Sequence, residues 1–308
     1  MFSRGCPAAM RAGASPFQKG DASPLSFFLQ SAAKLNLTLR ITGRRPDGYH
    51  DLRSLFFRLP GLESLTITFM YAHNVNDILE VQGEAVPGDN ILIKVLALAR
   101  QRTFVPSLRM KLVKNVPPGS GMGGGSGNAA ALISFMDMFC NGRPAVNAEE
   151  AGSDVPFLAG GFRFAAVSGR GERVEPLPVP PHHLRTLVAV PAWTVSTSAA
   201  YAALDALFPE RFPLSSQEAE EELRGVFSIL ARNGDARLLP NDFSEILLRQ
   251  HPEYASLFAL FQKAGACGWG ITGSGSASFA LFRDMDAVHK AAWALGDRKW
   301  IRKIILVE

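Results

Sequence analysis

The residues with the clearest chemical meaning are the glycines of a segment that reads Pro-Pro-Gly-Ser-Gly-Met-Gly-Gly-Gly-Ser-Gly-Asn-Ala-Ala at 117–130. Six of them fall within nine residues, from Gly119 to Gly127. Glycine loses more conformational freedom on folding than any other residue, so this density indicates that backbone without side chains is needed there. An apolar run precedes the segment, and a helix-like run that we expect to begin near Ser126 or Asn128 follows it. Backbone N–H groups that converge at a helix N-terminus bind anions, so the segment predicts a phosphate site.

Other interpretations of the glycine segment fit less well. Gly/Ser linkers seldom lead directly into an apolar helix. The P-loop pattern Gly-x-x-x-x-Gly-Lys-Ser/Thr is absent, and no Lys or Arg lies between Lys114 and Arg143. The dinucleotide pattern G-x-G-x-x-G occurs at Gly119 and at Gly268. After the first, the only acid near the required offset of about 20 residues is Asp137, inside the helix-like run, which argues against a nicotinamide enzyme.

Three polar residues outside this segment are further candidates. Lys34 and Asn36 lie two apart in an apolar run, 27–41, so in a strand both point to the same face. A buried ammonium needs a partner, whereas on an edge strand both side chains would simply face water. Asp154 precedes Val-Pro-Phe, and a Ser-Asp pair before a proline most often caps a turn. These features alone leave both alternatives open.

Hydrophobic periodicity predicts the elements that position these residues. In the first half we expect strands over 27–41, 52–59, 65–69, 78–81, 108–116 and 162–167, and helices over 90–102 and 129–139. In the second half we expect strands over 184–190, 278–282 and 301–307, and helices over 199–207, 216–232, 243–248, 255–264 and 287–295. Residues 170–181, which end in a proline-rich run at 176–181, are typical of a junction between domains. The pattern predicts an α+β fold with domains at 24–177 and 178–308, after a disordered extension at 1–23.

Composition restricts the class of protein. The chain has 308 residues, is 47% hydrophobic and carries a formal net charge of +4 from scattered Lys and Arg, so we expect a globular protein with no nucleic-acid partner. Its three cysteines are far apart, which predicts neither a metal pair nor a disulfide framework and fits a reducing, cytoplasmic location. No apolar run approaches the roughly 18 residues that span a bilayer, so no membrane association is expected. The first 23 residues lack a signal-peptide core, although a targeting leader remains an alternative to disorder.

Several motifs together resemble the GHMP kinase superfamily and, within it, the family of kinases that act on 4-diphosphocytidyl-2-C-methyl-D-erythritol. From about Leu25 to the end, the motifs occur in the order found in that family. They are Ala33-Lys-Leu-Asn-Leu37, Arg44-Arg-Pro-Asp-Gly-Tyr-His50, the glycine segment, Gly152-Ser-Asp-Val-Pro-Phe157, Gly169-Arg-Gly-Glu172, Ser196-Thr197, Asn241-Asp-Phe243 and Thr272-Gly-Ser-Gly-Ser276. The resemblance implies a two-domain fold, with a ribosomal-protein-like α+β domain followed by a ferredoxin-like α/β sandwich domain. It also implies ATP-dependent phosphorylation of the substrate's 2-hydroxyl in the non-mevalonate isoprenoid pathway.

The resemblance assigns the catalytic and nucleotide-binding roles. Asp154 would take the proton of the acceptor hydroxyl while Lys34 orients that hydroxyl, and Ser126 would lie near Mg²⁺. The glycine segment would cradle the phosphates of ATP, with two further residues near the adenosine. The residues implied for ATP are Pro118, Gly119, Ser120, Gly121, Met122, Gly123, Gly124, Gly125, Ser126, Gly127, Asn128, Asn90 and Lys114.

Substrate recognition follows from the same resemblance. Tyr49 and Tyr201 would stack on the two faces of cytosine while His50 reads its polar edge, because stacking alone does not distinguish bases. The other residues implied for the substrate are Asn36, Thr197, Gly273, Ser274 and Gly275. Small-molecule substrates are the only partners expected, in a monomer or weak homodimer.

The sequence departs from its relatives in two places. They commonly show Gly-Leu-Gly-Gly-Gly-Ser-Ser-Asn, whereas this chain has Met122 for Leu and Gly127 for the second Ser. Only about eleven residues separate Cys140 from Gly152, where relatives carry a longer segment. Two alternative functions stay open: another GHMP kinase, acting on homoserine or mevalonate, and a catalytically silent nucleotide or sugar-phosphate binding protein.

Overall fold

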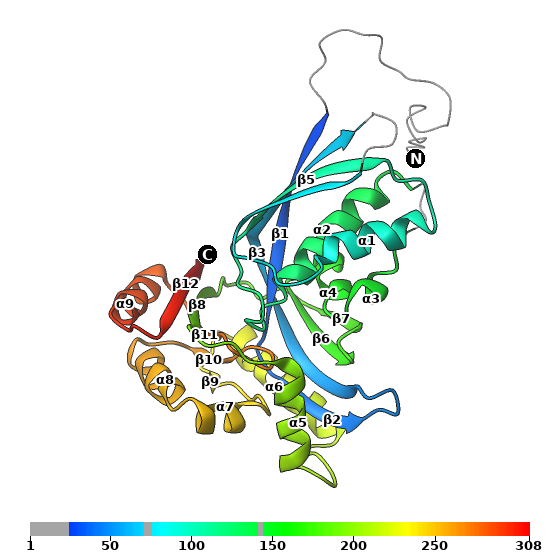
Figure 1. Cartoon of the computed structure of the whole chain (residues 1–308). Coiled ribbons are helices and arrows are strands. Elements are labelled where there is room, and N and C mark those ends of the chain that lie inside the picture. Colours follow the sequence, from blue (N-terminus) through cyan, green and yellow to red (C-terminus); the bar gives the residue numbers. More distant parts are fainter. Residues whose placement is uncertain (1–24, 71–75, 141–143) are drawn as a thin grey trace.

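The computed structural model describes residues 25–70, 76–140 and 144–308. The extension predicted at 1–23 lies outside the described residues. The described part combines two β-sheets with helices and confirms the predicted α+β class (Figure 1). A seven-stranded sheet is built from residues between Ser26 and Leu177, and a five-stranded sheet from residues between Arg185 and Val307.

The amino-terminal sheet is ordered β4-β5-β3-β6-β7, with β1 and β2 also paired to β3. Its strands are β1 Ser26–Asn36, β2 Arg40–Arg44, β3 His50–Met70, β4 Ile78–Gly83, β5 Ser107–Lys114, β6 Phe164–Gly169 and β7 Arg173–Leu177. Helices α1 Ile91–Arg100, α2 Gly124–Asp137, α3 Ala148–Ala151 and α4 Val155–Gly160 lie together on one side of it (Figure 1). Because side chains alternate along a strand, Phe56 joins the core beneath these helices while Leu55 and Phe57 join a second core on the opposite face.

The carboxy-terminal sheet is ordered β12-β8-β11-β10-β9. Its strands are β8 Arg185–Pro191, β9 Arg237–Leu238, β10 Gly268–Ile271, β11 Ser278–Phe282 and β12 Ile301–Val307. The helices of this half are α5 Thr197–Leu207, α6 Ser216–Ala231, α7 Ser244–Gln250, α8 Glu253–Lys263 and α9 Met285–Leu295. Val188 and Phe279 of this sheet join the same second core as Leu55 and Phe57, so the two sheets share a buried apolar layer. Among the described residues, no helix is long and apolar enough to span a membrane.

Two strand predictions were wrong in their boundaries. The single strand expected over 27–41 is split into β1 and β2, because the chain between them leaves the sheet and Leu39 N–H bonds to Pro240 O at 2.9 Å. The two strands expected over 52–59 and 65–69 are one strand, β3. Pro60 and Gly61 lie within β3 where its register with β1 shifts, and such an irregularity accommodates a residue without an N–H.

Other differences concern short elements. Helix α2 begins at Gly124, before the start expected near Ser126 or Asn128, so the last glycines form its first turn. Strand β7 occupies part of the 170–181 stretch that we interpreted as a junction, because Pro176 pairs at the edge of the sheet, where no N–H is required. The sequence analysis did not identify α3, α4, β9 or β10, all of which have seven residues or fewer.

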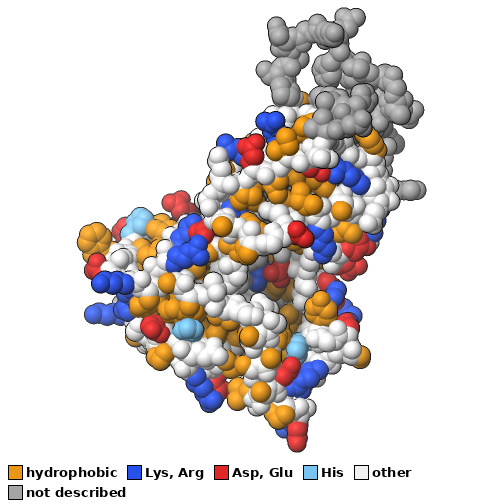
Figure 2. All heavy atoms as spheres, viewed as in Figure 1, with side chains coloured by type: hydrophobic (Ala, Val, Ile, Leu, Met, Phe, Trp, Pro, Cys, Tyr) orange, Lys and Arg blue, Asp and Glu red, His pale blue; other side chains and the backbone are white. Residues whose placement is uncertain are grey.

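The two halves are held together by polar contacts beside the shared core. Leu39 forms a parallel bridge with Asn241. Arg40 of β2 bonds to Asp242 at 2.6 Å and to Glu222 of α6 at 2.8 Å. Figure 2 shows the surface hollowed between the two halves, with charged side chains at the floor of the hollow. The glycine segment and the β1–β2 region lie along this boundary, which makes it the place to examine for a site.

Candidate active site

Lys34 is a buried cation on β1, and only 4% of its surface is exposed. Its ammonium donates to the Asn36 side-chain oxygen at 2.6 Å and to the Gly121 carbonyl at 2.8 Å. The same ammonium lies 5.2 Å from the centre of the Phe56 ring. The two-residue spacing therefore places Lys34 and Asn36 on one inward face, and the alternative that they face water on an edge strand is wrong.

Asp154 is the charged partner of Lys34. One of its carboxylate oxygens, Oδ2, lies 3.5 Å from the Lys34 ammonium. Asp154 occupies the N-cap position of α4, but its side chain accepts no capping hydrogen bond from that helix. The capping interpretation is therefore wrong for its side chain. About a quarter of the Asp154 side chain remains exposed, so the carboxylate is accessible to a ligand.

A buried polar network fixes Lys34 from the other side. Asn36 donates its amide to Ser54 Oγ at 2.8 Å, and Ser54 Oγ in turn donates to the Thr38 carbonyl. The backbone N–H of Asn36 donates to Thr272 Oγ1 at 2.9 Å, although the two residues are 236 positions apart. Buried polar groups with satisfied partners hold a single geometry. Asn36 is 3% exposed and accepts from the Lys34 ammonium, so it is a buried residue that positions Lys34.

The glycine segment wraps around this ion pair. Gly119, Gly121 and Gly123 have positive φ values of 73°, 77° and 65°. A Cβ on Gly121 would lie 2.2 Å from the Thr272 carbonyl oxygen, so no other residue fits there without movement. A Cβ on Gly123 would lie 3.1 Å from Asp154 Oδ2 and 3.2 Å from Lys34 Cε. The loop thus brings the N-terminus of α2 directly to the Lys34–Asp154 pair.

The N-terminus of α2 has the properties of an anion site. Its N-cap is Gly123, which offers no side-chain cap, and no acidic residue lies in its first turn. Within the described chain, the N–H groups of Gly124, Gly125 and Ser126 donate to no backbone carbonyl. Free N–H groups and the helix dipole together favour a negatively charged ligand. The rest of the segment is anchored through Ser120 O, which accepts from Ala277 N–H at 3.1 Å, and Met122 O, which accepts from Lys34 N–H at 2.8 Å.

Helix α2 packs closely on β1 because residue 127 is glycine. A Cβ there would lie 1.7 Å from the Ala32 carbonyl oxygen and 3.0 Å from Ser31 Oγ. The serine that the family resemblance implies at this position does not fit this backbone. Asn128, the next residue, is 1% exposed. Both residues therefore serve the packing of α2 against the sheet.

Two residues predicted near the adenosine have structural partners. The Lys114 ammonium lies 2.5 Å from Glu63 Oε1 and 2.8 Å from the Val116 carbonyl, and both charged side chains are buried. Burial lowers the pKa of Lys114, although the Glu63 carboxylate partly opposes this shift. Asn90 is the N-cap of α1, and its side-chain oxygen accepts from Leu92 N–H at 3.0 Å. A Cβ on Gly124 would lie 2.9 Å from the Lys114 ammonium, so Lys114 lies against the glycine segment, whereas Asn90 is half-buried at a helix start.

The oxygen atoms beside the ion pair suit Mg²⁺. Ser126 Oγ lies 4.0 Å from where a Cβ on Gly152 would be, next to the Ser153–Asp154 segment. Mg²⁺ usually binds one or two carboxylates together with substrate phosphates and waters. Ser126 supplies a hydroxyl here, whereas the Asp154 carboxylate is paired with Lys34. No cluster of three or more His, Cys, Asp or Glu occurs among the described residues, so phosphate oxygens would have to complete the coordination.

His50 lies at the end of the β2–β3 hairpin and is fixed by Asp205 of α5. Its Nε2 lies 2.9 Å from Asp205 Oδ1, which also accepts from Arg44 Nε at 2.7 Å. Burial alone would raise the pKa of Asp205, but the bonds from His50 and Arg44 outweigh it and hold that pKa below its usual value. The Tyr201 ring lies 4.6 Å from the His50 ring. Burial, with a contribution from the negative charge of Asp154, raises the pKa of Tyr201 to about 12, so its hydroxyl is neutral at physiological pH.

The two predicted stacking residues have different surroundings. Tyr49 is 55% exposed, and the Arg170 guanidinium lies 4.9 Å from its ring centre. Tyr201 is packed between His50 and Phe243, whose ring centre is 5.0 Å away. The structure therefore brings Tyr201 and His50 together and leaves Tyr49 open on the hairpin.

The closing loop at 272–276 meets the glycine segment. A Cβ on Gly273 would lie 3.2 Å from Gly121 Cα. Ser274 Oγ lies 3.1 Å from Thr197 Oγ1 at the start of α5, and a Cβ on Gly275 would lie 3.1 Å from Leu247. These residues form the wall of the site that belongs to the carboxy-terminal half.

Sequence reasoning missed three residues that position the site. Thr272 and Ser54 hold Asn36, and Asp205 holds His50. Thr272 opens the motif Thr272-Gly-Ser-Gly-Ser276, but the sequence analysis assigned it no role. Neither Ser54 nor Asp205 carries a local signal, because each acts on a residue far away in the sequence.

The fold and the glycine segment together define a class of protein. The family model for the GHMP kinases N terminal domain matches residues 90–161, and the model for the GHMP kinases C terminal domain matches residues 221–302. The structure of a homoserine kinase from Cytophaga hutchinsonii shares the fold, with a TM-score of 0.58 at 17% identity over 96% of this chain and 97% of that chain. The chain is therefore a GHMP kinase in fold and in sequence.

Closer relatives narrow the class. A 4-diphosphocytidyl-2-C-methyl-D-erythritol kinase from Solibacter usitatus is 34% identical over 87% of this chain and 85% of the relative. One from Nitratidesulfovibrio vulgaris is 35% identical over 85% of this chain and 92% of the relative. A crystal structure of 4-(cytidine 5'-diphospho)-2C-methyl-D-erythritol kinase covers 91% of this chain and 98% of its own, at 30% identity and a TM-score of 0.71. The chain belongs to the 4-diphosphocytidyl-2-C-methyl-D-erythritol kinase family.

Proposed function

We propose that the protein transfers the γ-phosphoryl group of ATP to the 2-hydroxyl of 4-diphosphocytidyl-2-C-methyl-D-erythritol, giving the 2-phosphate and ADP in the non-mevalonate isoprenoid pathway. The observation that carries the proposal is the 3.5 Å contact between Lys34 and Asp154 beside the uncapped N-terminus of α2. A base, a cation and an anion-binding helix start are the parts that phosphoryl transfer needs. The substrate named for the relatives described above supplies the identity of the acceptor.

Asp154 and Lys34 would have different roles toward the acceptor hydroxyl. The 2-hydroxyl oxygen attacks the γ-phosphorus, the bond from that phosphorus to the β,γ-bridging oxygen breaks, and ADP leaves with the bridging oxygen. Asp154 accepts the hydroxyl proton as the new P–O bond forms. The Lys34 ammonium, held by Asn36 and Gly121, orients the hydroxyl and offsets developing negative charge.

The nucleotide would lie against the glycine segment. The N–H groups of Gly124, Gly125 and Ser126 would donate to phosphate oxygens, and the positive φ values before them would keep side chains out of the way. Ser126 and phosphate oxygens would hold Mg²⁺, which neutralises charge on the transferring phosphate when bound, and Asp154 would stay available for the hydroxyl proton. Residues 118–126 would thus form the phosphate cradle, while Gly127 and Asn128 would hold α2 against the sheet and Asn90 would lie toward the adenosine.

Cytosine would bind between Tyr49 and the His50–Tyr201 pair. Tyr49 offers an exposed ring face for stacking, and His50 offers its second ring nitrogen to the base. Thr197, Ser274 and the adjoining glycines would enclose the methylerythritol end. We further propose a nucleotide-binding domain over 24–177, a second domain over 178–308, and a cytoplasmic monomer or weak homodimer without nucleic-acid or membrane partners.

The test is ADP release from MgATP with three candidate acceptors. Turnover with 4-diphosphocytidyl-2-C-methyl-D-erythritol, and none with mevalonate or homoserine, is the expected result. Turnover of mevalonate or homoserine would instead support another GHMP kinase. Normal ATP binding without turnover of any acceptor would support a catalytically silent binding protein.

A further inference from the structure

Arg170 is a half-buried arginine at the turn between β6 and β7 that the proposed function does not use. Its guanidinium lies 4.9 Å from the centre of the Tyr49 ring. Its backbone N–H donates to Glu172 Oε2 at 2.6 Å, which holds the turn in place. The side chain is thus directed at the proposed cytosine end of the site from a fixed backbone.

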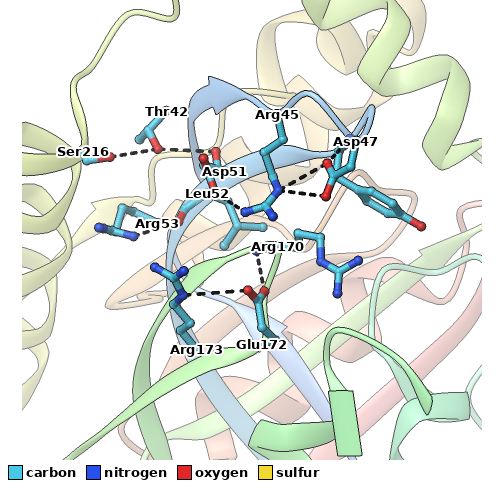
Figure 3. A network of polar contacts seen from close by, with 11 residues as sticks. Thr42, Arg45, Asp47, Asp51, Leu52, Arg53, Arg170, Glu172, Arg173 and Ser216 are labelled. Atoms are coloured by element: carbon cyan, nitrogen blue, oxygen red, sulfur yellow. Dashed lines mark hydrogen bonds and ion pairs between the residues drawn. The ribbon is translucent and has the colours of Figure 1, made fainter. Parts of the chain in front are cut away.

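Arg170 differs from the neighbouring arginines in having no hydrogen-bonded carboxylate, and its charge acts on Asp47 only at longer range. Arg44 bonds to Asp205 at 2.7 Å, and Arg45 bonds to Asp51 at 3.1 Å. Within the described ranges, no hydrogen bond or ion pair involves the Arg170 guanidinium. Figure 3 shows it beside the hairpin turn that carries Asp47, without a dashed contact at its guanidinium. Its charge and its five N–H donors are therefore available to an anion.

The turn that carries Arg170 also reaches the catalytic end of the site. A Cβ on Gly171 would lie 3.2 Å from Ser153 Cβ, so the backbone of the turn touches the residue before Asp154. Gly171 has a φ of 123°, which disfavours a side chain there. Arg170 accordingly lies on a turn between Tyr49 and the Ser153–Asp154 segment.

We propose that Arg170 binds the diphosphate of the cytidine substrate, an inference that rests on the proposed function. In this substrate the diphosphate connects the cytidine to the methylerythritol whose 2-hydroxyl must reach Asp154. A base at Tyr49 and a hydroxyl at Asp154 require the diphosphate to cross the turn that presents Arg170. Arginine binds phosphate oxygens through paired, charge-assisted hydrogen bonds. One face of Tyr49 would remain covered by Arg170 while the other stacks on the base.

The test measures binding of CDP, CMP and cytidine by calorimetry to the wild type, Arg170→Gln and Arg170→Lys. We expect Arg170→Gln to weaken CDP binding by about 10- to 100-fold, since hydrogen bonds to charged groups have this magnitude. Cytidine, which has no phosphate, should bind the variant and the wild type within a few-fold. The CDP affinity of Arg170→Lys should lie between those of the wild type and Arg170→Gln, because lysine keeps the charge but lacks the paired donors. The matched control is Arg173→Gln on the same turn, whose side chain is 74% exposed and lies 3.9 Å from Glu172.

The outcomes separate the two proposals. If Arg170→Gln keeps the wild-type preference for CDP over cytidine, or weakens CDP and cytidine equally, the role of Arg170 is disproved while the proposed function stands. If the wild type itself binds neither CDP nor cytidine, the proposed function is disproved, and the role of Arg170 is disproved with it. Retained ATP affinity in the variants establishes that they are folded.

Discussion

The Lys34 ammonium lies 3.5 Å from a carboxylate oxygen of Asp154, and the backbone of Gly123 runs beside both side chains. A β-strand, a short helix and the glycine loop therefore meet at one point. Lys34 is nearly fully buried, whereas Asp154 is partly exposed. This asymmetry suits a fixed cation and a carboxylate that contacts the acceptor.

Replacing Lys34 by Met should lower the rate of ADP formation by roughly 10²- to 10⁴-fold, because it removes the charge that orients the hydroxyl. It should also destabilise the fold by about 1–3 kcal/mol, since Asn36 Oδ1 and Gly121 O each lose a buried donor. Steady-state kinetics and urea unfolding measure the two effects.

Lys34→Arg is the control for charge alone. We expect it to be nearly as inactive, because Asn36 Oδ1 at 2.6 Å and the Gly121 carbonyl at 2.8 Å enclose a compact ammonium and leave no room for a planar guanidinium. Recovery of most of the activity in Lys34→Arg would contradict the requirement for this geometry.

Gly127→Ser introduces the serine that the family resemblance implies at this position, yet we expect it to destabilise the protein by about 1–3 kcal/mol. The new Cβ would meet the Ala32 carbonyl oxygen at 1.7 Å, so α2 must move away from β1. We also expect no gain in Mg²⁺ affinity, measured by titrating ATP binding with the metal.

Gly125→Ser is the matched stability control, because a Cβ at that position would contact only Ile91, at 3.9 Å. A Gly127→Ser protein as stable in urea as Gly125→Ser would be inconsistent with the close packing of α2 on β1.

Much of the site was predictable from short-range pattern, and the rest was not. The two-residue spacing of Lys34 and Asn36 predicted their common face, and the glycine density predicted the loop that leads into the uncapped N-terminus of α2. The full length of β3 could not be predicted, because proline and glycine usually interrupt a strand. Pairing with β1 on both sides of Pro60 and Gly61 keeps the strand continuous. The contact between His50 and Asp205 joins residues 155 positions apart, so no local signal reveals it.

Asp205→Asn should weaken discrimination of CDP from UDP. The carboxylate can only accept, so it fixes the proton of His50 on Nε2 and leaves Nδ1 as an acceptor for the amino group of cytosine. The side-chain amide in Asp205→Asn can either accept or donate a hydrogen bond, so it no longer fixes which nitrogen of His50 carries the proton. We expect the ratio of CDP to UDP affinity to fall by about 10-fold.

Calorimetry with both nucleotides measures this ratio, and Asp51→Asn on the neighbouring hairpin is the control. An unchanged ratio in Asp205→Asn would exclude the tautomer as a source of base selectivity. The lowered pKa of Asp205 keeps its carboxylate ionised at neutral pH, where the binding is measured, so it can accept a hydrogen bond from His50.

Tyr201 should make stability fall with pH in the alkaline range. Its pKa is about 12 in the folded protein, compared with about 10 in an unfolded chain. Between these values the folded protein retains a proton that the unfolded chain has lost, so stability is fully present below about pH 10 and declines toward about pH 12. The loss is on the order of 2–3 kcal/mol.

Urea unfolding at about pH 9 and about pH 11.5 measures the slope, and Tyr201→Phe should reduce it. Tyr254, whose pKa burial also raises, remains in both proteins and contributes equally to both slopes. Identical slopes would show that Tyr201 is not shielded from solvent as described.

The most direct test of the central claim is ADP formation by Asp154→Asn with MgATP and 4-diphosphocytidyl-2-C-methyl-D-erythritol. The matched control is Asp235→Asn, an exposed carboxylate that bonds Arg283 at 2.6 Å in the carboxy-terminal half. We expect Asp154→Asn to bind ATP yet to react at least about 100-fold more slowly than the wild type, while the control remains within a few-fold. An Asp154→Asn enzyme within a few-fold of the wild-type rate would contradict the assignment of Asp154 as the base.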